Sequence, residues 1–244
     1  MKITVIGAGA IGGNLASKLS AAGHDVQVAD ARGPETIPAD VLQTGARAVP
    51  VEEAVKDRDV VVLSIPFERV PELAALVTTI PAETVVIDTS NYYPHLSGPI
   101  DAVDNGQVET VRNAEALGRP LVKAWNAALA GTQKNKGLPA GTPGRIAIPV
   151  AADSDAARRI AMQLVDDTGF DPYDAGTLAD SWRQQPMGPA YCTELTSEEL
   201  GTALAAADPV KNVAVRNTMM DRFAALGPEF THDDVIEMNR AAHR

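Results

Sequence analysis

Short runs of β-branched residues alternate with helical stretches over the first two thirds of the chain. The runs that predict strands cover residues 2–6, 26–28, 46–49, 60–65, 84–88, 121–124 and 145–150. Apolar residues recur at helical spacing over 11–22, 69–78 and 153–167, and Asp153 is the expected N-cap of the last of these helices. Parallel strands need a crossover connection, so this alternation predicts an α/β fold with a doubly wound, mostly parallel Rossmann sheet.

The pattern changes after Gly176. Residues 171–174 are expected to form a last edge strand, and the two prolines within 184–193 predict a loop. Helical segments are expected over 196–207, 209–226 and 231–243, the first with a capping box formed by Thr196 and Glu199. We therefore expect a dinucleotide-binding Rossmann domain over residues 1–126. A smaller, mainly helical C-terminal segment for substrate binding and dimerisation would follow over 127–244.

A glycine-rich turn follows the first predicted strand. Residues 7–12 read Gly-Ala-Gly-Ala-Ile-Gly, with a strand before them and a helix after them. In this context Gly7 permits the tight turn, Gly9 lets a pyrophosphate approach the backbone, and Gly12 lets the helix pack closely. Free amides and the helix dipole then favour an anion at this point. The turn predicts dinucleotide binding, and the alternative is a purely structural turn.

Two charged residues at the end of the second strand bear on the choice of dinucleotide. Asp30 stands where a carboxylate usually accepts hydrogen bonds from the ribose hydroxyls of NAD, while Arg32 could hold the 2′-phosphate of NADP. A like-charge contact at about 4 Å and an effective dielectric near 20 costs about 4 kcal/mol. Asp30 would therefore exclude NADP unless Arg32 neutralises it, and the sequence leaves both cofactors open.

Composition and charge narrow the class of protein. The 244 residues include 21 Lys and Arg against 32 Asp and Glu, a formal net charge of -11, which disfavours nucleic acid as a partner. The single cysteine excludes an internal disulfide and is typical of a reducing compartment. We expect a cytoplasmic protein with no secretory signal, no membrane segment and no metal site, because no ligand cluster has metal spacing.

Several longer strings carry a resemblance to a known family. They cover residues 31–36, 63–67, 88–93, 121–126, 148–153 and 169–178. Together with the glycine turn they resemble the coenzyme F420-dependent NADP oxidoreductase family and its bacterial relatives over residues 1 to 182. The most specific are Val-Lys-Ala-Trp-Asn at 122–126 and the string Gly-Phe-Asp-Pro-x-Asp-Ala-Gly-x-Leu at 169–178. The chain departs from the family at Asp30-Ala31, where a hydroxyl or an arginine is usual.

The resemblance implies an activity and a set of binding residues. The family transfers a hydride between a nicotinamide and a deazaflavin, so the protein supplies alignment and needs no strong acid or base. By matching position, the pyrophosphate would be held by the turn and the adenosine end would meet Arg32. The turn residues concerned are Gly7, Gly9, Ala10, Ile11 and Gly12. Ile65, Pro66 and Phe67 would flank the path from the adenosine ribose to the nicotinamide, and Ala124 and Trp125 would lie near the nicotinamide. Asp30, from its place at the end of the second strand, completes the expected cofactor-binding residues.

Five further side chains are candidates for chemistry. Asn126, next to the nicotinamide, could fix its carboxamide, and His95 could donate a proton to a reduced carbonyl or imine. Lys123 would either orient a substrate anion or hold its ammonium in water. Trp182 and Arg183 could form a lid over the second substrate, or belong to a linker.

We therefore expect an NAD(P)-dependent oxidoreductase that transfers a hydride between NADP(H), with NAD possible, and a second cofactor or small acceptor, coenzyme F420 first among them. One alternative is a reductase of a small carbonyl, hydroxyacid or imine substrate. Another is a non-catalytic module that senses nicotinamide. The resemblance also suggests a homodimer. The sequence leaves open the acceptor, the reaction direction and the role of residues 183–244.

Overall fold

The computed structural model describes residues 1–243. Eight strands form one sheet in the order β3-β2-β1-β4-β5-β6-β7-β8. The strands are β1 (Lys2–Ile6), β2 (Asp25–Ala29), β3 (Arg47–Ala48), β4 (Val60–Leu63), β5 (Val85–Asp88), β6 (Val122–Lys123), β7 (Ala147–Ala152) and β8 (Asp171–Asp174). The pairs from β3 to β6 are parallel, β7 runs antiparallel to β6, and β8 is parallel to β7. The expected mostly parallel Rossmann sheet is confirmed.

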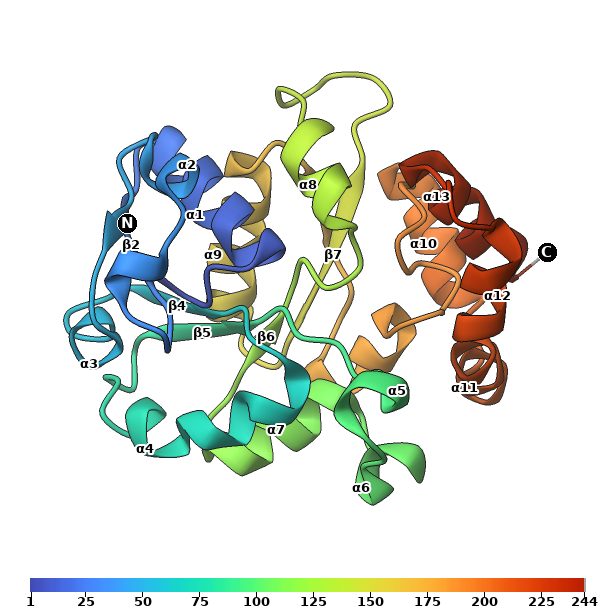
Figure 1. Ribbon diagram of the computed structural model, residues 1–244, viewed down its shortest axis with the longest axis horizontal. Helices are drawn as coiled ribbons and strands as arrows, with labels where there is room; N and C mark the ends of the chain where they lie inside the picture. The colour runs from blue at the N-terminus through green and yellow to red at the C-terminus, as the bar shows by residue number, and fades with distance from the viewer. Residues whose placement is uncertain (244) are drawn as a thin grey trace.

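Helices cover both faces of the sheet and one of its ends (Figure 1). Along the Rossmann part they are α1 (Ala10–Ala21), η1 (Pro34–Thr36), α2 (Ala39–Leu42), α3 (Val51–Ala54), η2 (Phe67–Leu73), α4 (Ala74–Val77), α5 (Pro94–Ser97), α6 (Asp101–Asp104), α7 (Glu109–Leu117) and α8 (Ala130–Asn135). They continue with α9 (Asp155–Asp167), η3 (Leu178–Gln184), α10 (Ser197–Ala205), α11 (Pro209–Asn217), α12 (Met219–Leu226) and α13 (His232–Ala241), where η marks a 3-10 helix.

The hydrophobic core lies on both sides of the sheet, because successive side chains of a strand point to opposite faces. Ile3 and Val5 of β1 pack with Leu15 and Leu19 on the side of α1 and α9. Ile6 joins a second cluster on the side of α4 and α7. Helices α10 to α13 form a separate group at the β8 end of the sheet (Figure 1). Chain order thus brings the carboxyl ends of β1 and β4 together at the point where the strand order reverses, the usual place for a ligand.

Several local expectations are wrong in detail. Residues 69–78 are not one helix, since η2 occupies 67–73 and Pro71 within it lacks the N–H that an α-helix would use. The helix expected over 209–226 is interrupted at Thr218. The N-cap of α9 is Ser154, whose side chain accepts from the backbone N–H of Ala157, and Asp153 instead accepts from the N–H of Leu178. The sequence pattern does not predict helices α7 and α8.

Within residues 1–243 no helix combines the length and apolar character needed to cross a membrane. The division of the chain at residue 126 stays a prediction.

Candidate functional site

The three glycines of the turn after β1 differ in what surrounds them. Gly7 has a φ of 103°, and a Cβ there would lie 2.1 Å from the carbonyl oxygen of Ser64. A Cβ on Gly12 would lie 2.0 Å from the carbonyl oxygen of Gly7, so both positions exclude any side chain. A Cβ on Gly9 would meet no atom within 4 Å, because this position faces open space. The cradle therefore fits a pyrophosphate beside Gly9 and at the start of α1.

One cavity of about 340 Å³ lies on the β2 side of the turn. Its walls are the turn itself, the Asp30–Arg32 segment after β2, the Ser64–Pro66 segment after β4, and Arg69 with Glu72 of η2. We call it the adenosine-side cavity. Among the residues expected to bind the cofactor, it brings together Gly7, Gly9, Asp30, Arg32 and the Ile65–Pro66 pair.

Asp30 and Arg32 form an ion pair at the rim of this cavity. The Arg32 Nε atom lies 2.8 Å from Asp30 Oδ1, and the Asp30 carboxylate also accepts from the backbone N–H of Ala8 at 3.4 Å. The hydrogen bond from Arg32 is the main reason why the pKa of Asp30 falls to about 2. The Arg32 side chain is 70% exposed, so it neutralises the carboxylate while staying within reach of a ligand.

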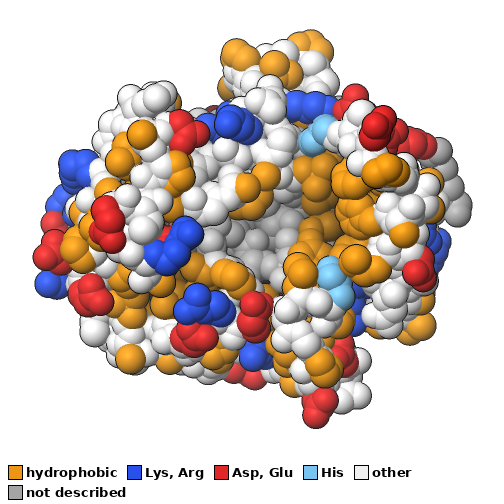
Figure 2. Space-filling model, viewed as in Figure 1, with side chains coloured by type: hydrophobic (Ala, Val, Ile, Leu, Met, Phe, Trp, Pro, Cys, Tyr) orange, Lys and Arg blue, Asp and Glu red, His pale blue; other side chains and the backbone are white. Residues whose placement is uncertain are grey.

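A second cavity of about 340 Å³ lies on the other side of the turn and shares Gly9 and Ser64–Pro66 with the first. It is lined further by Ala10 and Ile11, by 89–91 and Tyr93 after β5, by 125–126 and 128–130 after β6, and by Tyr191 and Cys192. We call it the nicotinamide-side cavity. Figure 2 shows a hollow in this face of the molecule, between the Rossmann part and the C-terminal helices. The two cavities and the turn thus form one groove.

Three amide side chains meet at the wall of the nicotinamide-side cavity. Asn126, 3% exposed, donates from Nδ2 to the Asn91 side-chain oxygen at 3.1 Å and to the Gln184 carbonyl at 2.8 Å. Its Oδ1 accepts from Gln184 Nε2 at 2.9 Å. Sequence reasoning singled out Asn126 but did not predict its pairing with Gln184, which lies 58 residues further along the chain.

Two tyrosine hydroxyls, from Tyr93 and Tyr191, are hydrogen-bonded to each other in the same cavity. Asn91 Nδ2 donates to Tyr191 Oη at 3.3 Å. Burial raises the pKa of both Tyr93 and Tyr191 well above the ordinary value of a tyrosine, so both hydroxyls keep their protons at neutral pH. Sequence reasoning missed this pair. Tyr93 stands in the string after β5, but no spacing connects it with Tyr191.

Three predicted site residues lie outside the two cavities, and a fourth, Trp125, lines one of them. His95 on α5 is exposed and lines neither cavity, although its ring centroid is 5.8 Å from that of Tyr93. Phe67 is buried and packs on Tyr92, with ring centroids 5.5 Å apart. Ala124 is fully buried behind Trp125. Trp125 lines the nicotinamide-side cavity with a φ of 58°, but its indole N–H donates to Thr168 Oγ1 at 3.3 Å, toward the end of α9.

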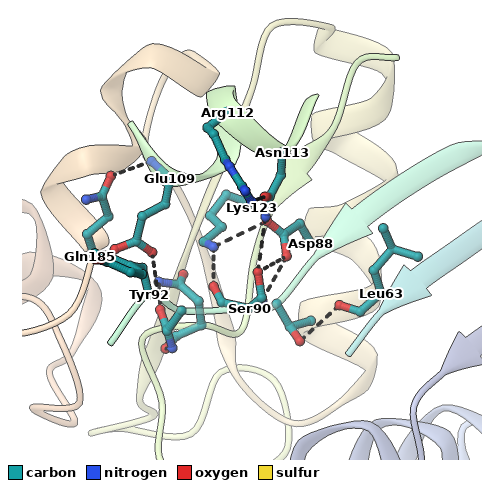
Figure 3. A network of polar contacts seen from close by, with 12 residues as sticks. Leu63, Asp88, Ser90, Tyr92, Glu109, Arg112, Asn113, Lys123 and Gln185 are labelled. Atoms are coloured by element: carbon teal, nitrogen blue, oxygen red, sulfur yellow. Dashed lines mark hydrogen bonds and ion pairs between the residues drawn. The ribbon is translucent and has the colours of Figure 1, made fainter. Parts of the chain in front are cut away.

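A buried charged network lies behind the nicotinamide-side cavity (Figure 3). Lys123 is fully buried; its ammonium donates to the Ser90 carbonyl and lies 3.5 Å from Asp88 Oδ2. The expectation of an ammonium in water is therefore wrong. Ser90 and Asn113 donate to the same Asp88 carboxylate. This network holds the 88–91 segment, and with it Asn91, in place at the cavity wall.

The Trp182–Arg183 pair expected to form a lid lies in η3. The Arg183 guanidinium stacks over the Trp182 ring at 4.4 Å and donates to the Leu204 carbonyl at 3.3 Å. Neither residue lines the two cavities of the groove. The pair connects η3 with α10.

Known proteins are similar to this chain in sequence and in fold. The family described as coenzyme F420-dependent NADP oxidoreductase matches residues 2–92. The protein YjhV of Escherichia coli K12 is 41% identical over 104 residues, which cover 43% of this chain and 76% of YjhV. The hypothetical protein SMa0349 of Sinorhizobium meliloti is 30% identical with a TM-score of 0.63, over 74% of this chain and 87% of that one.

A candidate F420-dependent NADP reductase of Arthrobacter sp. FB24 has the same fold over 93% of this chain and 95% of its own, with a TM-score of 0.60 and 19% identity. The glycine cradle fits a dinucleotide, and the matching segment contains that cradle, β2, β4 and β5. The chain therefore belongs to the coenzyme F420-dependent NADP oxidoreductase family and is an NAD(P)-dependent oxidoreductase.

Proposed function

We propose that this protein transfers a hydride between NADP(H) and a second cofactor, coenzyme F420 being the acceptor that the family indicates. The observation that carries the proposal is the groove formed by two cavities that share Gly9 and Ser64–Pro66. A dinucleotide that crosses the turn at Gly9 would have its adenosine half in one cavity and its nicotinamide half in the other.

The residues of the chain would bind and orient the cofactor. The amides at the start of α1 would hold the pyrophosphate, and Ile65 with Pro66 would flank the path between the two halves. The nicotinamide carboxamide would meet the Asn91–Asn126–Gln184 cluster, whose side chains already fix one another. When bound, the nicotinamide and the acceptor supply the redox chemistry, and the protein supplies their alignment.

NADP is proposed over NAD because Asp30 is already neutralised. Its carboxylate accepts from Arg32 and from the Ala8 amide, which removes the repulsion that a bare carboxylate would exert on a 2′-phosphate. Arg69, at the same cavity, adds a second guanidinium, itself paired with Glu72. Arg32 is exposed and can turn from Asp30 to a phosphate.

The test is turnover of the purified protein with NADPH and oxidised F420, followed by the absorbance of both cofactors. We expect one F420 reduced per NADPH consumed, and a much slower reaction with NADH. A protein that binds NADPH but fails to reduce F420 would contradict the acceptor. A protein that binds neither pyridine nucleotide would contradict the whole proposal.

The tyrosine pair favours a second candidate, the reduction of a small carbonyl or imine. Such a reduction needs a hydride at carbon and a proton at oxygen or nitrogen, and the Tyr93–Tyr191 pair offers protonated hydroxyls inside the nicotinamide-side cavity. Water would then return the proton to the tyrosinate. Under this candidate Tyr191→Phe should lower kcat on a cyclic imine at least tenfold while NADPH still binds. Tyr173→Phe, on β8 outside the groove, is the matched control.

The remaining expectations stay proposals. A homodimer would cover apolar side chains of the C-terminal helices, among which Val210 is 79% and Met220 is 55% exposed. Sedimentation equilibrium decides this point, with a monomer as the contrary result. We also propose a cytoplasmic location for this protein.

A further inference from the structure

A third cavity, separate from the groove, lies between the Rossmann part and the C-terminal helices. It has a volume of about 350 Å³ and shares no lining residue with the nicotinamide-side cavity. Its walls come from the segment before α7, from the end of η3 with the residues after it, and from α11. We call it the α7–α11 cavity. A volume of this order is sufficient for a small ligand.

Buried polar atoms without a hydrogen-bond partner gather at this cavity. Asn212 on α11 is 6% exposed, and neither its Oδ1 nor its Nδ2 atom has a partner. The Nε atom of Arg216, one turn further along α11 and also 6% exposed, has none either. On the opposite wall Glu109 is fully buried, and its Oε1 atom lacks a partner. Buried polar groups are almost always hydrogen-bonded, so this concentration needs an explanation.

The charges at this cavity are already balanced. The Arg216 Nη2 atom lies 3.2 Å from Asp104 Oδ1, and its guanidinium covers the Tyr92 ring at 5.0 Å. Burial raises the pKa of Glu109 to about 7, which further reduces the net charge of the wall. A charged ligand therefore gains no net Coulomb attraction and would lose its hydration. The occupant that fits is uncharged.

The free atoms also define the hydrogen bonds that the occupant must make. Asn212 Nδ2 and Arg216 Nε are donors and Asn212 Oδ1 is an acceptor. Glu109 Oε2 already accepts from the Tyr92 N–H, so Oε1 is a donor when the Glu109 carboxyl is protonated. A carboxamide or lactam carries one carbonyl and one N–H side by side, which complements the Asn212 amide in both directions. Apolar side chains form most of the remaining wall, with Trp182, Pro186 and Val213 among them, beside Gln107 and Gln185. We infer that the α7–α11 cavity is a binding site for a small, planar, uncharged amide or lactam.

Benzamide is a suitable probe, measured by titration calorimetry on the full chain saturated with NADPH so that the groove is occupied. We expect a dissociation constant of about 1 mM or tighter, with benzoate at least about tenfold weaker because the site has no net positive charge. In nuclear magnetic resonance spectra of the wild type, benzamide should shift the side-chain amide signals of Asn212 and leave those of Asn126 unchanged.

The variant Asn212→Leu removes both amide atoms at nearly constant size. We expect the benzamide dissociation constant to rise at least about tenfold, and the melting temperature of the unliganded protein to rise, because an unpartnered buried amide disappears. The matched control is Asn217→Leu, on the exposed side of the same helix, which should not change the benzamide dissociation constant. NADPH oxidation should be unchanged in both variants.

The inference is overturned by any of three results. The first is that benzamide fails to bind the wild type at about 10 mM, or that it shifts the signals of Asn126 and not those of Asn212. The second is that benzamide binds Asn212→Leu as tightly as it binds the wild type. The third is that benzamide and benzoate bind equally tightly, which would assign the cavity to apolar molecules in general. The resonance measurement uses the wild type alone, so it decides the question even if Asn212→Leu does not fold.

Discussion

At the scale of single residues, the site depends on two glycines that leave no room for a side chain and on one carboxylate whose charge is neutralised by a neighbouring guanidinium. At Gly7 and Gly12 nearby backbone atoms leave no room for a side chain, whereas at Gly9 an added Cβ would meet no atom within 4 Å. Asp30 is a carboxylate whose charge Arg32 already balances. The same glycine pattern thus contains two structural residues and one whose surroundings fit a ligand, and substitutions separate these roles.

Gly9→Ala should lower the affinity for NADPH at least tenfold and change the melting temperature little. The backbone at Gly9, with φ of -70° and ψ of -172°, accepts an alanine, so the added methyl meets only the space proposed for the pyrophosphate. Gly12→Ala should instead lower the melting temperature, because its Cβ would lie 2.0 Å from a carbonyl oxygen. Calorimetric titration and thermal unfolding separate the two; unchanged NADPH affinity in Gly9→Ala would contradict the proposed pose.

Arg32→Ser should raise the KM for NADPH about tenfold or more and change the KM for NADH little. The variant removes a guanidinium from the proposed 2′-phosphate and leaves Asp30 without its counter-charge. Arg47→Ser is the matched control, because Arg47 forms a similar exposed ion pair with Asp25, 2.7 Å apart, outside the groove. Equal changes for both cofactors would argue against recognition of the 2′-phosphate by Arg32.

At the scale of secondary structure, periodicity located elements better than it located their ends. The stripe of apolar residues predicts α9, but the sequence favours Asp153 as its N-cap, one residue before the observed Ser154. Asp and Ser are both good N-caps, and the choice depends on a partner outside the helix, since Asp153 accepts from Leu178. The segment over 67–77 shows the same limit, because Pro71 favours a 3-10 turn within an apparently helical pattern.

Ser154→Ala should lower the free energy of unfolding by about 1 kcal/mol, since it removes the acceptor for the Ala157 N–H at the start of α9. In a chain of this size we expect the melting temperature to fall by roughly 2–4 °C. Urea unfolding gives the measurement. Ser197→Ala, one residue past the Thr196 cap of α10, is the control and should have little effect; an equal loss in both would point to a general effect of the substitution.

At the scale of the whole molecule, the C-terminal part completes a site that the Rossmann part begins. Tyr191 joins Asn91, Tyr93 and Asn126 at one cavity, although 100 residues separate Asn91 from Tyr191. Gln184 supports this cavity from behind, through its hydrogen bond to Asn126. The buried network of Asp88, Lys123 and Glu109 lies at the same junction, where α7 meets η3 through a hydrogen bond from the Glu109 amide to Gln185 Oε1.

Glu109 should make the stability of the molecule depend on pH. Its pKa is raised to about 7 by burial, against an ordinary value of 4.5, so between these values the folded chain keeps a proton that the unfolded chain releases. Its contribution to stability is therefore complete below about pH 4.5 and falls by roughly 1.4 kcal/mol per pH unit up to about 7. Above that pH the loss is constant.

Glu109→Gln should remove this dependence, because glutamine resembles the protonated acid. The variant should match the wild type near pH 5 and be more stable at pH 8, as measured by urea unfolding at each pH. Glu115→Gln, on the exposed side of α7, should follow the wild type throughout. A variant that loses stability equally at both pH values would show that Glu109 is ionised in the folded protein.

The sequence by itself determined the features that depend on local pattern. Alternating strands and helices predicted the Rossmann sheet, and the strings around residues 63–67 and 122–126 predicted the family. The glycine turn predicted a cradle, and the structure has open space beside Gly9 at that turn. Each of these depends on residues that are neighbours in the chain, or on a periodicity that burial imposes on one element.

Only the tertiary structure decided which distant side chains meet. It buried Lys123 against Asp88, paired Tyr93 with Tyr191, and placed His95 outside the cavity. It also left Asn212 and Arg216 with unpartnered atoms around a separate space. No spacing encodes such contacts, because they arise when strands pair and when the C-terminal segment packs against the end of the sheet. The local environment then sets burial, charge and hydrogen bonding.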